Sequence, residues 1–252
     1  MTSTFPRYGL ARVLSKRGLC SRSVAERWVR EGRVRVGGRR VTDPESPTAL
    51  DEPGIEVDGD AAVAVAHVYL ALNKPRGLVT TARDERGRPT VYQCIEGLGL
   101  PWVAPAGRLD QASEGLLVLS NDPVFNAALT EPSSALHKTY HVQVGALPTG
   151  DQLHALRAGV VEGGERLAAV RIELLRQGCR QAWLEVVLDE GRNRHIRRLL
   201  AAQGLEVRRL LRIAIGPLEL GDLAKGQVRR LSAAEVELLR NAAGGGTSGG
   251  LG

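Results

Sequence analysis

Cysteine, aromatic residues and long apolar runs are all scarce in this chain of 252 residues. The three cysteines, Cys20, Cys94 and Cys179, are odd in number and far apart, so their spacing fits neither a disulfide framework nor a zinc site. No window approaches the roughly 18 consecutive apolar residues of a membrane helix, and the first residues lack a signal peptide's apolar stretch. We therefore expect a cytoplasmic protein with no membrane contact.

The motifs of nucleotide and metal chemistry are missing as well. There is no Gly-rich phosphate loop ending in Lys-Ser or Lys-Thr, no HExxH and no dinucleotide-binding glycine motif. None of the five histidines has a partner at metal-ligand spacing: His67, His137, His141, His154 and His195. The sequence thus predicts neither a bound metal nor a cofactor.

Positive charge is present in excess, and it is clustered. The net charge is +6; residues 7–40 hold eleven Arg and Lys against two acids, and residues 191–212 hold seven Arg against one acid. A single basic patch is as well explained by a solvated surface that keeps a protein in solution. Two patches beside recognisable motifs favour a polyanionic partner, because each neutralised phosphate releases counterions.

The N-terminal part predicts a small basic domain over residues 7–60. A helix is expected over 8–17, and a second helix follows in which Ser23 and Glu26 have the spacing of a capping box. Gly37-Gly38 then marks the turn of a hairpin between short strands rich in Val and Arg. The domain is therefore predicted to be helix, helix and hairpin, closed by a last strand at 55–57.

The larger domain, residues 67–240, mixes strands and helices without the regular alternation of a doubly wound fold. We expect strands at 68–72, 115–119, 139–144, 170–175, 183–188 and 210–215, and helices at 151–156, 193–203 and 232–240. The prediction is an α+β fold with a mixed, mainly antiparallel sheet. Residues 241–252, most of them Gly, Ser and Thr, are predicted to form a disordered tail.

Asp110 is the leading candidate for chemistry, because it lies directly before an apolar strand that begins near Gly115. Alone, such an acid is usually a solvated loop residue. Its context, GRLDQASEGLLVLSND, resembles the catalytic motif of the pseudouridine synthases, in particular their Rsu branch. In that family the Asp of the motif carries the reaction, so the resemblance implies that Asp110 is the catalytic carboxylate.

Four further strings resemble segments of the same family in the same order. They are LNKPRG from Leu72, KTY from Lys138, EGRNRHIRR from Glu190, and LSKRGLCSRSVAERWVREGRVRVGGRRV from Leu14, the last resembling the small RNA-binding module of ribosomal protein S4. Together the resemblances cover nearly all of residues 8–238. They imply isomerisation of uridine in RNA, a reaction that transfers no electrons and needs no redox cofactor.

The resemblance also assigns roles. Tyr140 would stack on the target base near its carbon-5 proton, and Arg197 would pair with Asp110 and keep a desolvated carboxylate ionised. The target uridine must be flipped out of its stack, and Arg108 is expected to contact the vacated space. Leu211 is a weaker candidate for the pocket wall, because core packing explains an apolar strand residue equally well.

Basic residues of both domains are the predicted RNA contacts. In the catalytic domain they are Lys74, Lys138, Arg192 and Arg194; in the N-terminal domain they are Lys16, Arg17, Arg22, Arg33 and Arg35. Such contacts to the RNA backbone position the molecule without reading its sequence.

Two other functions remain open at this point. The chain could be a non-catalytic RNA-binding factor of ribosome assembly, or a DNA-binding regulator that uses residues 8–31 as a helix-turn-helix. The Asp110 motif favours the enzyme over both. We expect a monomer that acts on ribosomal RNA, free or in an assembling subunit, with large-subunit RNA favoured over small-subunit RNA.

Overall fold

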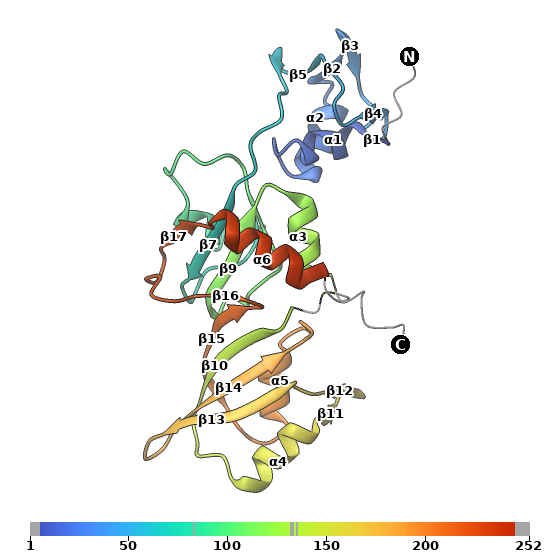
Figure 1. Cartoon of the computed structure of the whole chain (residues 1–252). Helices are drawn as coiled ribbons and strands as arrows, with labels where there is room; N and C mark the ends of the chain where they lie inside the picture. Colours follow the sequence, from blue (N-terminus) through green and yellow to red (C-terminus); the bar gives the residue numbers. More distant parts are fainter. Residues whose placement is uncertain (1–5, 83, 132–133, 135, 245–252) are drawn as a thin grey trace, which may run out of the picture. The chain divides into compact units, whose positions relative to one another are not determined.

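A computed structural model describes residues 6–82, 84–131, 134 and 136–244 of the chain (Figure 1). The chain divides into two compact units. The first comprises the described residues up to Tyr69 together with Gly97–Ala104 and Leu119–Asn126, and the second comprises the remaining described residues.

The N-terminal part of the first unit is the expected helix, helix and hairpin. Its helices are α1 (Leu10–Lys16) and α2 (Arg22–Arg30), and its four-stranded sheet has the order β3 (Arg39–Val41), β2 (Val34–Val36), β5 (Ile55–Val57) and β6 (Asp60–Ala61). A second pair, β1 (Arg7–Gly9) with β4 (Pro47–Ala49), was not predicted. Leu10, Val13, Leu14, Ala25, Val29 and Val34 are fully buried where the helices meet the sheet.

The cap of α2 differs from the prediction. Ser21, not Ser23, accepts the hydrogen bond from the backbone N–H of Val24, at 3.2 Å. Ser21 has the extended backbone that an N-cap requires (φ −67°, ψ 156°), whereas Ser23 already lies inside the first helical turn. At the other end Gly32 has a positive φ of 69°, which glycine adopts without steric cost.

The second unit contains most of a large mixed sheet. The order is β13 (Arg171–Gln177), β14 (Ala182–Leu188), β10 (Lys138–Val144), β15 (Val207–Ile215), β9 (Glu114–Ser120), β7 (Tyr69–Lys74) and β17 (Val228–Arg230), with β8 (Ala104–Pro105) on β9 and β16 (Leu218–Glu219) on β15. From β13 to β15 every pairing is antiparallel, and β15 runs parallel to β9. The predicted α+β class is confirmed.

Helices cover one face of the β13–β15 part of this sheet. Inward-facing residues of β10 and β14 form one core with α4 (Gly150–Ala158), α5 (His195–Ala201) and Leu167 of the hairpin β11 (Val160–Glu162) and β12 (Glu165–Leu167). Val142, Leu184, Leu156 and Leu199 are fully buried in it. Because strand side chains alternate, the neighbours of Val142 and Leu184 lie on the opposite face of the sheet.

The remaining helices are α3 (Pro123–Thr130), which was not predicted, a short 3₁₀ helix η1 (Val91–Cys94), and α6 (Ala233–Gly244). Ser232 and Glu235 form a capping box at the start of α6, with reciprocal backbone hydrogen bonds of 2.8 and 3.2 Å. This helix continues to Gly244, so the predicted disordered tail is wrong for residues 241–244, and its remainder lies outside the described residues. Every helix in the described part of the chain is too short or too polar to span a bilayer.

Candidate active site

Asp110 lies on the loop that enters strand β9. The loop turns tightly after Asp110, because the N–H of Ser113 donates to the Asp110 carbonyl at 2.9 Å. The side chain is half-buried and borders two cavities. No described residue makes a hydrogen bond or an ion pair with its carboxylate, which leaves this group available to a substrate.

Lys74, at the end of β7, holds this loop by hydrogen bonds to its backbone. Its Nζ donates to the carbonyl oxygens of Ser113 at 2.8 Å, Asp110 at 3.1 Å and Pro75 at 3.2 Å. The residue is 0% exposed, and burial lowers the pKa of its ammonium group to about 8, against the opposing effect of the nearby Asp110 charge. The predicted RNA contact of Lys74 is therefore wrong: its ammonium group points into the protein and fixes the backbone at Asp110.

The segment after Lys74 fixes the loop on both sides of Asp110. The Thr80 hydroxyl donates to the Leu109 carbonyl at 2.7 Å. The N–H of Gly77 donates to the Gln111 carbonyl at 2.7 Å, and the Gln111 side chain donates back to the Gly77 carbonyl at 3.0 Å. The sequence motif LNKPRG thus serves as the support of the GRLD motif, although nothing in the sequence identified Thr80 or Gly77 individually.

Arg197 approaches the same loop from helix α5, but not as predicted. Its guanidinium donates to the carbonyl of Ala112 at 3.2 Å and to that of Val207 at 3.3 Å, and it makes no ion pair with Asp110 among the described residues. Burial lowers the pKa of Arg197, Arg194 lowers it further, and the negative charge of Asp110 raises it. Arg197 is therefore close enough to Asp110 for electrostatic interaction, but its direct contact is the backbone two residues further on.

A small cavity of about 90 Å³ brings five of the predicted residues together. It is lined by Asp110, Tyr140, the exposed Arg108, Arg192 and Arg194. Tyr140 lies on β10, opposite Val186 on one side and Arg212 on the other. The predicted pocket wall, Leu211, needs correction. Leu210 lines the cavity, and alternation along β15 turns Leu211 to the other face, where its side chain fills the space beside Gly115.

A second cavity, of about 460 Å³, also borders Asp110 and is lined by Arg76, Gly77, Gln111, Ala112 and Arg194. Arg194 has a left-handed backbone (φ 49°, ψ 31°), a conformation that costs a non-glycine residue roughly 1 kcal/mol. This conformation leads the chain from the loop after β14 into α5 while Arg194 borders both cavities. Arg76 was not among the predicted site residues; its place in LNKPRG, two residues after Lys74, is the signal that could have identified it.

Comparison with known proteins decides the family. The family model described as RNA pseudouridylate synthase matches residues 68–202, more than half of the chain. The chain belongs to this family. It is therefore an enzyme, an isomerase that makes pseudouridine in RNA. The model of the S4 domain matches residues 9–47, so the resemblances of both domains are confirmed.

Relatives of this synthase match it along nearly their whole length. An uncharacterized RNA pseudouridine synthase of Mycobacterium tuberculosis is 38% identical over 239 residues, which cover 93% of this chain and 94% of the relative. Ribosomal large subunit pseudouridine synthase B of Bacillus subtilis is 35% identical over 234 residues, covering 92% and 95%. A crystal structure of pseudouridylate synthase, 26% identical, superposes with a TM-score of 0.65 over 92% of this chain and 99% of that one.

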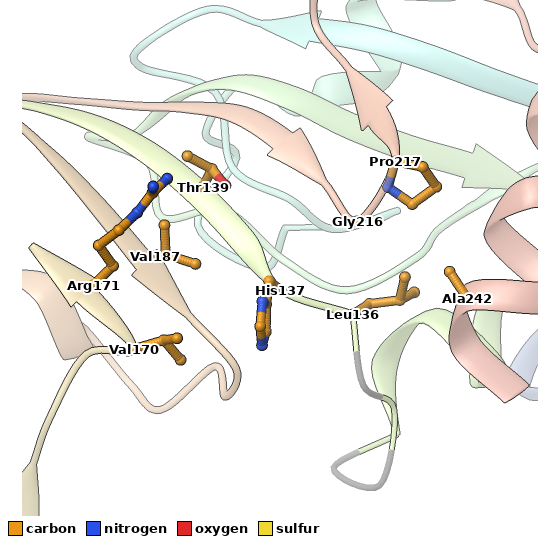
Figure 2. Close-up of a pocket in the computed structure, with 9 residues that line it drawn as sticks. All are labelled: Leu136, His137, Thr139, Val170, Arg171, Val187, Gly216, Pro217 and Ala242. Carbon is orange, nitrogen blue, oxygen red and sulfur yellow. The ribbon is translucent and has the colours of Figure 1, made fainter. Parts of the chain in front are cut away.

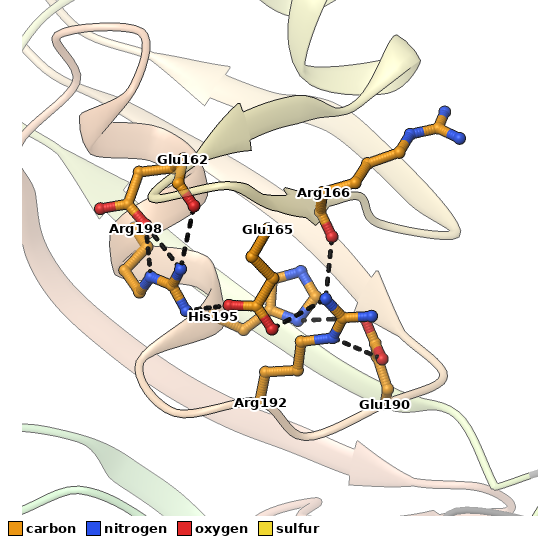
Figure 3. A network of polar contacts seen from close by, with 7 residues as sticks. All are labelled: Glu162, Glu165, Arg166, Glu190, Arg192, His195 and Arg198. Atoms are coloured by element: carbon orange, nitrogen blue, oxygen red, sulfur yellow. Dashed lines mark hydrogen bonds and ion pairs between the residues drawn. The ribbon is translucent and has the colours of Figure 1, made fainter.

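Two arginines of the synthase's EGRNRHIRR segment form ion pairs with carboxylates (Figure 3). Arg192 contacts Glu190 at 2.8 Å and Glu165 at 2.9 Å, and Arg198 contacts Glu165 at 2.7 Å. Hydrogen bonding from Arg198 is the first cause of the lowered pKa of Glu165. The predicted RNA contact Arg192 is thus neutralised in this structure. Since exposed ion pairs contribute only ~0–1 kcal/mol, these contacts do not exclude Arg192, which remains a predicted RNA contact.

The residue between them, His195, is buried beneath this network, with Nδ1 3.8 Å from a Glu190 oxygen. Lys138, another predicted contact, starts strand β10 and is half-buried, and its pKa is lowered first by burial and then by Arg212. Within the described part of the chain, no group of three or more His, Cys, Asp or Glu is arranged to hold a metal.

In the S4 domain, Arg17 is not the phosphate contact that was predicted. It is 9% exposed, and its guanidinium donates to the backbone carbonyls of Glu52 at 2.5 Å, Ala62 at 2.8 Å and Leu50 at 3.1 Å. Burial lowers its pKa. Arg17 therefore ties α1 to the chain that follows β4, and its charge does not reach the surface.

The other predicted contacts of this domain lie at its surface. Lys16 lies over the ring of Tyr8, 4.7 Å from its centroid, and Arg35 donates to the Gly38 carbonyl at 2.9 Å. Arg22 pairs with Glu26 and Glu45, and Arg33 pairs with Asp58. These four cations remain predicted RNA contacts.

A third hollow in the synthase, of about 560 Å³, is lined by Leu136, His137, Thr139, Val170, Arg171, Val187, Gly216, Pro217 and Ala242 (Figure 2). It shares no lining residue with either cavity beside Asp110. Arg171, the arginine in this lining, forms an ion pair with Glu185 at 2.5 Å. The candidate active site is therefore the pair of cavities that meet at Asp110.

Proposed function

We propose that this synthase isomerises a specific uridine of large-subunit ribosomal RNA, with Asp110 as its catalytic carboxylate. The observation that carries this proposal is the position of Asp110, unpaired and half-buried where two cavities meet, on a loop held by Lys74 and Arg197. The choice of large-subunit RNA rests on the similarity to ribosomal large subunit pseudouridine synthase B of Bacillus subtilis.

The proposed reaction breaks the bond from ribose carbon-1′ to uracil nitrogen-1 and forms one from carbon-1′ to carbon-5. The proton lost from carbon-5 is balanced by the proton gained at nitrogen-1, so substrate and product are isomers. Asp110 acts by attack on the ribose or on the uracil ring, or by assisting formation of a glycal intermediate. Tyr140, which lines the same small cavity, stacks on the base and, directly or through a water, takes the carbon-5 proton.

The surrounding cations bind the flipped nucleotide. Arg76 and Arg194 border the larger cavity, where their guanidinium groups can hold the phosphates on either side of the target nucleotide. Arg108, exposed at the small cavity, contacts the space that the base leaves. Arg197 and Lys74 are positioning residues: they act on Asp110 through the loop backbone and through their positive charge.

RNA outside the target nucleotide is bound by the S4 domain, through the surface cations Lys16, Arg22, Arg33 and Arg35. Backbone contacts of this kind position a folded RNA, while its shape and a splayed loop supply specificity. We further propose that the protein is a monomer that acts in the cytoplasm, on ribosomal RNA that is free or in an assembling subunit.

Tritium release tests this function. Transcripts of large-subunit and small-subunit ribosomal RNA are labelled with 5-tritiated uridine and incubated with the protein, with Asp110→Asn as the inactive control. We expect release from the large-subunit transcript alone, at one site that chemical mapping of pseudouridine identifies. Release from the small-subunit transcript alone would overturn the choice of subunit. Binding without release from either transcript would favour the non-catalytic assembly factor.

A further inference from the structure

The open face of the β13–β15 sheet carries a row of residues that the reaction does not use. Arg176 lies opposite Trp183, Trp183 opposite Gln143, and Gln143 opposite Arg209, so the four residues cross four adjacent strands in register. Their strand neighbours Leu184 and Val142 are fully buried on the other face, under α4 and α5. The row therefore faces away from those helices.

Trp183 is flanked by both arginines. The guanidinium carbon of Arg176 lies 5.2 Å from the centroid of the Trp183 ring, and that of Arg209 lies 5.7 Å from it. Gln143 stands between Trp183 and Arg209 and donates to Gln181 at 2.8 Å. Stacked arginine and tryptophan present flat, positively charged surfaces, the kind on which unpaired bases stack.

Charge in this row is predominantly positive. Arg209 bonds the carboxylate of Glu114 at 3.0 and 3.2 Å, and Lys225 bonds the same carboxylate at 2.6 Å, so two cations oppose one buried acid. Arg176 and, at the β13–β14 turn, Arg180 are exposed. The next row on this face holds the acids Glu173 and Glu185, which Arg171 contacts at 4.0 and 2.5 Å.

We propose that this row is a second RNA-binding surface, on which single-stranded RNA outside the target nucleotide stacks its bases against Arg176, Trp183 and Arg209. The inference rests on the proposed action on RNA and deepens it. Arg209 is held by Glu114 and is therefore preorganised, with its side chain 42% exposed. Arg176 is exposed beside Trp183, and the Gln143 side chain, whose Nε2 donates to Gln181, can offer its amide oxygen to a base edge.

The test measures binding of a fluorescein-labelled oligouridylate of about ten nucleotides to the full chain, by fluorescence anisotropy across a range of salt. Trp183→Leu should weaken binding about tenfold without changing the salt slope, because it removes stacking and no charge. Trp183→Phe should restore most of the affinity. Arg176→Gln should weaken binding and make the log–log salt slope shallower by about 0.7, the value of one phosphate contact on a single strand.

Arg230→Gln is the matched control. It removes one exposed arginine from β17, the strand at the opposite edge of the same sheet, and should leave the oligouridylate affinity within about twofold of the original. Photocrosslinking of an oligomer containing 5-iodouridine, followed by mass spectrometry of tryptic peptides, should place a crosslink on Trp183 in the peptide 181–192.

The proposal is overturned if Trp183→Leu keeps its affinity while its circular dichroism is native, since Trp183 would then only cover the sheet. It is overturned equally if no crosslink maps to Trp183, or if light scattering shows that Trp183→Leu converts a dimer into a monomer. Lack of tritium release by the unaltered protein, with oligouridylate still bound and crosslinked, would count against the proposed isomerisation and not against this surface.

Discussion

Lys74→Met tests whether a buried charge positions the catalytic loop. The substitution keeps an unbranched side chain but removes three hydrogen bonds to carbonyl oxygens at Pro75, Asp110 and Ser113. Each such bond from a charged donor contributes ~1.5 kcal/mol, or about 4–5 kcal/mol for the set. A pKa lowered from 10.5 to about 8 means that holding the charge in the folded state costs about 3 kcal/mol at neutral pH. The net loss of stability should therefore be small, about 1–2 kcal/mol.

The effect on turnover should be much larger than the effect on stability. The lost bonds fix the backbone of Asp110 itself, and a displacement of about 1 Å at a reacting group can lower the rate about 100-fold. Single-turnover tritium release at saturating RNA measures this directly. A variant that reacts at the original rate would refute the idea that Lys74 positions Asp110.

The pH dependence gives a second, independent reading. Because the pKa of Lys74 is lower in the folded state than in the unfolded state, the folded protein binds fewer protons between about pH 8 and pH 10.5. Its free energy of unfolding should therefore rise with pH over this window, by about 1 kcal/mol between about pH 7 and about pH 9. Lys74→Met should lack this increment. Urea unfolding of both proteins at each pH measures the difference, and equal pH profiles would mean that the lysine is not protonated and buried as described.

Three further predictions concern single residues. Asp110→Asn should abolish pseudouridine formation while the fold, by circular dichroism, and the RNA affinity stay largely intact; near-normal turnover would refute the assignment of Asp110. Arg197→Met should lower the single-turnover rate at saturating RNA about 100-fold, with little recovery in Arg197→Lys, because a lysine lacks the planar guanidinium that reaches two carbonyl groups. The control, Arg192→Met, should weaken RNA binding instead. If Arg197→Met reacts at the rate of the original protein, Arg197 is a phosphate contact. Arg17→Met should lower the melting temperature, because it loses three hydrogen bonds to backbone carbonyls. Lys16→Gln, the neighbouring control, should lower RNA affinity and leave the melting temperature unchanged. The reverse pattern would contradict the burial of Arg17.

Local signals in the sequence predicted most of the elements. The Gly37-Gly38 hairpin, the helix expected at 151–156 and the alternating strands of the sheet depend on neighbours within a few residues, and the structure contains all of them. The cap of α2 was misplaced because Ser21 and Ser23 are both good caps, and only the backbone angles select Ser21. The short strand β4 has no periodic signal, because it exists only through its pairing with β1.

The sequence identified which residue types matter at the site, but not which atoms they contact. The strings GRLD, KTY and EGRNRHIRR brought Asp110, Tyr140 and Arg197 to attention, and Asp110 and Tyr140 line one cavity. The arginine partner was expected at the Asp110 carboxylate and instead lies at the Ala112 carbonyl. A sequence motif indicates that a cation lies near the carboxylate. The distance between the two side chains depends on how α5 and the Asp110 loop pack together.

Charge was the property that sequence alone predicted least well. Adjacent basic residues of one cluster, Lys16 and Arg17, have opposite environments, because Lys16 lies over the ring of Tyr8 at the surface and Arg17 turns inward to three carbonyl groups. Lys74, predicted to contact RNA, is fully buried and holds the loop backbone instead. The sequence by itself determined the family and the α+β class and singled out Asp110 as the proposed catalytic carboxylate, since these follow from strings of neighbouring residues. Only the tertiary structure decided which cations lie at the surface and which hold the protein together, because burial and hydrogen bonding are set by segments far apart in the chain.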